Sequence, residues 1–215
     1  MPGASAFSLP FDEAMRYFLS KKIVTPSQFA AMDSALKQKA FTVAGLARDD
    51  MLRDIYDAIA SGLGQGTGIE QFKKDFAGII QKAGWDPTGG SAYRVSQIFD
   101  TNVAVSYAAG RYRQMRDPDV IKVRPLWRWV ESTAINPRPE HQQFWNLILP
   151  HDDPFWGKFY PQSEWGCQCG IECLSEREAA EIEGQHKDSN HPVQSAAPDL
   201  PEPAVRLFNA QEWDF

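Results

Sequence analysis

Cysteine is scarce in this chain of 215 residues, which has three, all between Cys167 and Cys173. An odd number of thiols so close together cannot form a framework of disulfides, and a bridge across Cys-x-Cys would close almost no loop. The sequence therefore predicts that these residues are reduced thiols or metal ligands.

Long apolar runs are also missing. No stretch approaches the roughly 20 apolar residues of a membrane-spanning helix. Residues 1–11 do not combine a basic segment with an apolar one, as a signal peptide would. We therefore expect no membrane interaction and a location in the cytosol. The hydrophobic fraction of 43% is sufficient for a sizeable core.

The chain also lacks an excess of basic residues, since its formal net charge is −6. Residues 172–215 contain ten Asp or Glu and three Lys or Arg, so the other 171 residues carry a net charge of +1. This balance argues against a protein whose whole surface neutralises nucleic-acid phosphates. The acidity belongs to the C-terminal part of the chain.

The first half of the sequence predicts helices. Apolar residues recur at three- and four-residue steps over 11–19, and the segment Thr25-Pro26-Ser27-Gln28 has the pattern of a capped helix start. We predict a third helix over 49–61, ended by the glycines of 62–68, and a fourth over 69–84.

The second half predicts a mixture of helix and strand. Residues 86–90 have the composition of a linker, and a long helix is expected over 91–116. The apolar period then changes to two over 120–131, which is typical of a strand with one solvated face. A short acidic helix is expected over 175–183, and a disordered linker over 184–203.

These patterns predict an α+β protein in three parts. The parts are a helical arm over 1–86, a small mixed domain over 88–180, and a flexible acidic tail over 181–215 that ends in an apolar motif. The linker at 86–90 is the predicted domain boundary.

A series of short motifs carries a resemblance to a known family. In chain order the motifs are Ala109–Met115, Trp127–Val130, Arg138–His141, Asp152–Trp156, Cys167–Cys169 and Leu174–Glu178. In order and spacing they resemble the phage Mu F-like head morphogenesis proteins over roughly residues 40–180. The chain departs from the family at residues 134–137 and at Phe144-Trp145-Asn146, which replaces a Leu-x-Gly turn.

The resemblance implies a minor capsid component of a tailed bacteriophage or prophage, and no established catalytic activity. It implies a low-copy protein inside the head near the portal vertex, with the portal protein, the major capsid protein or both as partners. The expected location is the virion interior, and the host cytoplasm during assembly.

A possible zinc site is suggested by His141, Cys167 and Cys169, since two thiolates and an imidazole satisfy three tetrahedral positions. The fourth ligand could be Cys173, His151 or Asp152. Against this, Cys-x-Cys projects its side chains to opposite faces of a regular strand. The alternative is that the thiols are buried as small hydrophobic groups.

An enzymatic alternative is a nuclease or toxin-like enzyme delivered with phage DNA. Its candidate residues are Glu140, His141 and Asp152, but the chain has no His-Glu-x-x-His motif. The sequence therefore favours a binding protein over an enzyme.

A cluster of basic residues could bind an acidic partner or packaged DNA. The cluster contains Arg111, Arg113, Arg116, Lys122, Arg124 and Arg128. We expect it to dock together with the Trp-rich strand, although ordinary solvated faces are an equally good interpretation. A DNA-packaging accessory protein is a further alternative for the chain.

Tryptophan is abundant, with seven residues, and most are expected in the core. The terminal residues Trp213 and Phe215 fit a peptide that docks into a groove of a partner, or one that folds back onto the domain.

Overall fold

The computed structural model describes residues 12–65, 69–85, 90–132, 134–162 and 167–199. The chain divides into two compact units, the first running to Gly110 and the second beginning at Arg111. We expected the division at 86–90, of which 86–89 lie outside the described residues, whereas it falls inside helix α6 (Ser91–Met115). The reason is that the first turns of α6 carry Val95, Ile98 and Phe99 into the core of unit 1.

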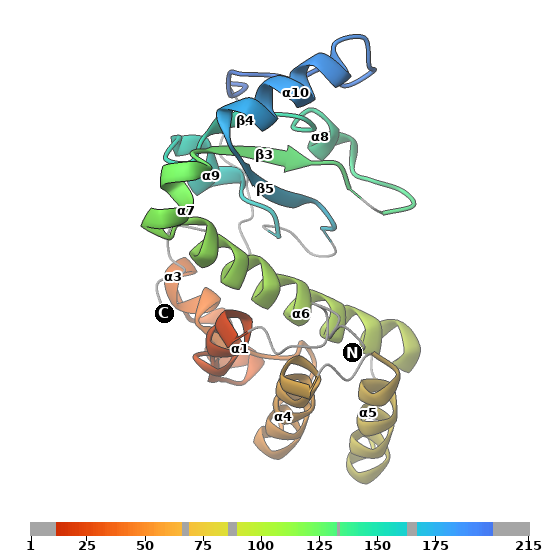
Figure 1. Cartoon of the computed structure of the whole chain (residues 1–215). Helices are drawn as coiled ribbons and strands as arrows, with labels where there is room; N and C mark the ends of the chain where they lie inside the picture. Colours follow the sequence, from red (N-terminus) through yellow and green to blue (C-terminus); the bar gives the residue numbers. More distant parts are fainter. Residues whose placement is uncertain (1–11, 66–68, 86–89, 133, 163–166, 200–215) are drawn as a thin grey trace, which may run out of the picture. The chain divides into compact units, whose positions relative to one another are not determined.

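Unit 1 is mainly helical (Figure 1). Besides the start of α6, its elements are α1 (Asp12–Leu19), β1 (Lys22–Ile23), α2 (Pro26–Ala30), α3 (Ser34–Gln38), β2 (Ala40–Phe41), α4 (Asp49–Gln65) and α5 (Ile69–Ala83). β1 and β2 pair in parallel, and α4 and α5 pack side by side. The predicted capping box is confirmed, because Thr25 accepts from the Gln28 amide and Gln28 reaches back to Thr25.

Helix α4 is longer than predicted, since it continues through Gly62 and Gly64 to Gln65. The packing of α1 explains why glycine does not end it. A Cβ atom at Gly64 would lie 3.2 Å from Cε of Met15. The missing side chain thus gives Met15 room against α4, and this tertiary contact outweighs the low helix propensity of glycine.

The core of unit 1 consists of apolar side chains supplied at helical spacing. α4 contributes Leu52, Ile55 and Ile59, all fully buried. The ring of Phe72 on α5 lies 4.8 Å from that of Phe99 on α6, measured between centroids. These contacts join the three longest described helices in one hydrophobic cluster.

Unit 2 contains a three-stranded antiparallel sheet and short helices. Its elements after α6 are α7 (Pro118–Val123), β3 (Leu126–Val130), α8 (Pro139–Gln142), β4 (Ile148–Pro150), α9 (Pro154–Phe159), β5 (Gly170–Leu174) and α10 (Glu176–His186). Among the described residues, β3 lies between β4 and β5 in this sheet (Figure 1). The predicted α+β class is therefore confirmed.

The strand predicted over 120–131 begins only at Leu126, because residues 118–123 form α7. Pro118 occupies the first turn, and the carboxylate of Asp117 accepts from the Asp119 amide, so the local signals favour a helix. The two-residue spacing of Ile121 and Val123 was misleading.

The faces of β3 alternate as predicted from Trp127 onward. Trp127 and Trp129 are buried, with exposed fractions of 0% and 1%. Between them Arg128 points to the other face, where its guanidinium pairs with Glu172 of β5 at 2.7 Å. The tryptophans are core residues and cannot form a docking face, so that part of the docking hypothesis is wrong.

The segment predicted as a disordered linker is ordered as far as the structure describes it. α10 continues to His186, and Gln194 forms a bridge with Leu147, the Ile148 amide donating to the Gln194 carbonyl at 2.8 Å. Asn146 also donates to the His191 carbonyl at 2.7 Å. The prediction of a flexible tail is therefore wrong for residues up to 199. Specific hydrogen bonds attach this segment to unit 2, and composition alone does not reveal them. Residues 200–215, including Trp213 and Phe215, lie outside the described residues.

In the described part of the chain, no helix combines the length and the apolar character needed to cross a membrane.

Candidate metal centre

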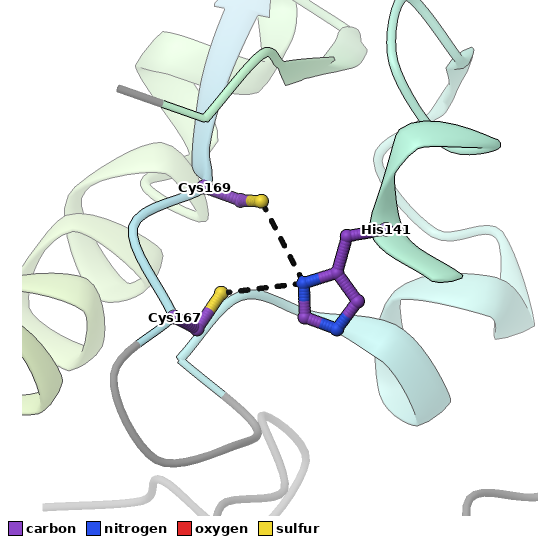
Figure 2. Close-up of side chains that lie close together, drawn as sticks. All are labelled: His141, Cys167 and Cys169. Carbon is purple, nitrogen blue, oxygen red and sulfur yellow. Dashed lines mark hydrogen bonds between the residues drawn. The ribbon is translucent and has the colours of Figure 1, made fainter. Parts of the chain in front are cut away.

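Two short segments of unit 2 bring a histidine and two cysteines together (Figure 2). His141 lies on α8, a single turn that begins with Pro139 after the N-cap residue Arg138. Cys167 and Cys169 lie immediately before β5, which starts at Gly170. The three side chains are all buried.

Both sulfur atoms face the same ring nitrogen. The Sγ atoms of Cys167 and Cys169 each lie 3.7 Å from Nδ1 of His141. The three potential ligand atoms lie within 4.8 Å of one another. The objection that Cys-x-Cys projects to opposite faces does not apply, because neither cysteine belongs to a regular strand.

The other predicted ligands lie elsewhere. Cys173 is buried on β5, in register opposite Trp127, and Asp152 is exposed after β4. The ring of His151 contacts that of Trp127 at a centroid distance of 6.4 Å. Within the described ranges, the group of close potential ligands contains His141, Cys167 and Cys169 and none of these three.

The two thiols differ in acidity because they interact directly. The contact with Cys167 is the largest cause that lowers the pKa of Cys169, to about 7. The same contact, followed by burial, raises the pKa of Cys167 above its usual range. Ser132 and the charge of Arg138 also favour the Cys169 thiolate. The pair therefore gives up its first proton easily and its second with difficulty.

The enzymatic candidates Glu140, His141 and Asp152 do not share one environment. Glu140 is exposed on α8, whereas the neighbouring His141 is buried with Nδ1 facing the cysteines. In the described part of the chain, neither Glu140 nor Asp152 belongs to a group of close potential metal ligands.

The predicted arginine cluster divides into two kinds of residue. Arg124 donates to the Cys173 carbonyl and pairs with Glu178 at 2.7 Å, and Arg128 is similarly held by Glu172. These two side chains stabilise unit 2. Arg111, Arg113 and Arg116 remain exposed at the end of α6, where Arg116 also contacts the Tyr112 ring.

Comparison with known proteins gives a match to the family model of Phage Mu protein F like protein over residues 53–172. The chain belongs to this family. The Mu F-like region includes His141, Cys167, Cys169 and most of the sheet. The resemblance inferred from the motifs is thereby confirmed.

Two curated Mu F proteins are similar to this chain. One, provisionally named capsid assembly protein F, is from Escherichia phage Mu and is 32% identical over 194 residues, or 83% of this chain and 44% of that protein. The other is the Mu-like prophage FluMu F protein of Haemophilus influenzae, 31% identical over 163 residues, or 71% of this chain and 39% of that protein. The chain thus spans less than half the length of these Mu F proteins. No solved structure gives a significant match.

One departure from the Mu F pattern has a structural explanation. Asn146 replaces the glycine of the Leu-x-Gly turn and has a φ of 60°, in the left-handed region that asparagine tolerates best after glycine. Its side chain accepts from Arg128 and donates to the His191 carbonyl. Sequence reasoning missed this role, although an asparagine at a glycine position is the signal that could have indicated it.

Proposed function

We propose that this chain is a component of phage head assembly, present in low copy inside the head shell near the portal. The observation that carries the proposal is the family match over residues 53–172, which includes parts of both units. The name of the Escherichia phage Mu relative, which refers to capsid assembly, supports the same role.

The exposed arginines at the end of α6 are the proposed contact with the portal protein or the major capsid protein. Arg111, Arg113 and Arg116 recur over less than two helical turns, and Lys122 on α7 is also exposed. Clustered cations of this kind favour an acidic protein surface, because long-range attraction increases the rate of encounter.

A complementation experiment tests the proposal. A phage or prophage lacking the gene receives either the natural chain or the double variant Arg111→Glu, Arg113→Glu. The control is Lys74→Glu, Lys82→Glu, which makes the same charge change at exposed positions of α5.

Electron microscopy would count DNA-filled heads, and mass spectrometry would measure the chain in procapsids. We expect loss of filled heads without the gene, and reduced incorporation of the arginine variant but not of the lysine control. Normal heads without the gene would contradict the assembly role. Equal incorporation of both variants would contradict the proposed contact.

The basic cluster could instead contact packaged DNA, and salt dependence separates the two partners. If the purified chain bound duplex DNA with an affinity that falls steeply between low and physiological salt, the result would indicate that the basic cluster binds DNA and would favour a DNA-packaging role. We expect no such binding, because the net charge of the chain is −6.

A further inference from the structure

The two sulfur-to-nitrogen distances among His141, Cys167 and Cys169 match edges of a zinc tetrahedron. Zinc bonds of about 2.3 Å to sulfur and about 2.05 Å to nitrogen at the tetrahedral angle place sulfur and nitrogen about 3.6 Å apart. The two Sγ to Nδ1 distances are each 3.7 Å. Since the three atoms also lie within 4.8 Å of one another, one metal ion can bond to all of them.

A full hydrogen bond to Nδ1 accounts for one of the two sulfur contacts at a time. A ring nitrogen has either one proton or one in-plane lone pair, so Nδ1 cannot form a full hydrogen bond with both sulfurs at once. A cation between the atoms would use the lone pair of His141 and both thiolates together. Two thiolates and an imidazole are ligands that zinc prefers in proteins.

The surroundings also suit a bound metal with anionic ligands. The imidazole packs edge-on against the ring of Trp129, at a centroid distance of 5.9 Å. Nε1 of the same Trp129 is buried and has no hydrogen-bond partner within the described structure. The indole N–H is thus available to donate a hydrogen bond to a metal-bound sulfur, as outer-shell groups of metal sites commonly do.

We propose that the chain binds one zinc ion through Nδ1 of His141 and the Sγ atoms of Cys167 and Cys169. The ion links α8 to the segment before β5, two parts of unit 2 whose ligands lie 26 and 28 residues apart in the sequence. Within the described residues the group supplies three of the four ligands of a tetrahedral site. The ion stabilises the loops around the sheet.

The test uses the whole chain, purified under reducing conditions, and measures its zinc content and its spectrum after cobalt(II) substitution. Native mass spectrometry should show one zinc per chain. Cobalt should give sulfur-to-metal charge-transfer absorption and the strong visible bands of tetrahedral coordination. Cys169→Ser and His141→Gln should each weaken metal binding by more than about 100-fold, since loss of an outer-shell group alone costs 10- to 100-fold.

Cys173→Ala is the matched control, because Cys173 is buried on β5 outside the ligand group. It should retain the metal and the cobalt spectrum. If the ligand variants do not fold, hydrogen exchange of the natural chain, with and without a chelator, tests the proposal instead. A chelator should then loosen residues 139–142 and 167–174, and leave α4 and α5 of unit 1 unchanged.

Zinc below about one tenth of an equivalent, cobalt without charge-transfer absorption, or a spectrum unchanged by Cys169→Ser would overturn the proposal. A Cys167–Cys169 disulfide that persists in reductant would overturn it as well. These measurements use purified protein and do not depend on the role in head assembly.

Discussion

In unit 1 the long helices bring apolar residues together at regular spacing. Unit 2 also has a core of aromatic rings, but its short elements are joined in addition by polar side chains that are far apart in the sequence. α4 and α5 have 17 and 15 residues, but α8 has four and β4 has three. In unit 2, Arg128 bonds to Asn146 and Glu172, which are 18 and 44 residues away.

This difference teaches where each unit is vulnerable. Unit 1 draws its stability from distributed burial, so a surface change in a helix has little effect. In unit 2 a single residue, Asn146, contacts Arg128, His186 and His191. Loss of the Asn146 side chain would therefore destabilise several elements of unit 2 at once.

The largest expected effect comes from removing a buried ring in each unit. Trp129→Ala in unit 2 and Phe76→Ala in unit 1 should each lower the free energy of unfolding by about 3–5 kcal/mol, because both create a large cavity. Hydrogen exchange should show the loosening mainly in the unit that carries the change. Equal loosening of both units by both variants would contradict this localised effect.

A smaller effect is expected at Asn146. Asn146→Leu should cost about 2–4 kcal/mol, since it strains a left-handed backbone and leaves partly buried partners without their hydrogen bonds. Hydrogen exchange should reveal a loss of protection in residues 187–199. Asn136→Leu, at an exposed position, is the control. The account fails here if residues 187–199 keep their protection in the Asn146 variant.

Unit 1 also has a buried charge, which gives a test by pH. Burial lowers the pKa of Lys21 to about 8, so between pH 8 and 10.5 the unfolded chain binds more protons than the folded one. The free-energy cost of burying the charged Lys21 side chain is full below pH 8 and disappears as the pH rises toward 10.5. Lys21→Met should therefore stabilise the chain by about 1–3 kcal/mol at pH 7 and by much less at pH 10. Denaturant titrations at the two pH values measure this difference, and a constant difference would contradict the burial effect.

The smallest effects are expected at the two capping boxes, Thr25 with Gln28 in unit 1 and Ser175 with Glu178 in unit 2. Thr25→Ala in unit 1 should cost about 1 kcal/mol, because a first-turn amide loses its acceptor. Ser175→Ala in unit 2 should cost slightly more, since its partner Glu178 also pairs with Arg124. Thr25→Ser and Ser175→Thr retain the acceptor and serve as controls. A larger cost at Thr25 in thermal unfolding would reverse the comparison.

The same contrast explains what could be predicted from the sequence. Helices α1, α2, α5 and α6 follow from apolar spacing and end signals, which are local properties. The length of α4 required knowledge of Met15 packed at Gly64. In unit 2, α7 was mistaken for a strand because Ile121 and Val123 share the two-residue spacing of β3.

The candidate site was partly predictable for a related reason. His141, Cys167 and Cys169 could be grouped by chemistry, and the structure brings these three together. Cys173 has the same chemistry, but its register opposite Trp127 on β5 separates it from the group. Which residue lies opposite Cys173 depends on the register of the sheet, and composition and spacing do not specify that register.

The most direct test of the head-assembly role is the amount of this protein in purified procapsids and mature heads of the phage or prophage that encodes it. Quantitative mass spectrometry should find it in procapsids at a few copies per portal. Its absence from both particles would contradict the account and return the nuclease or toxin-like alternative to consideration.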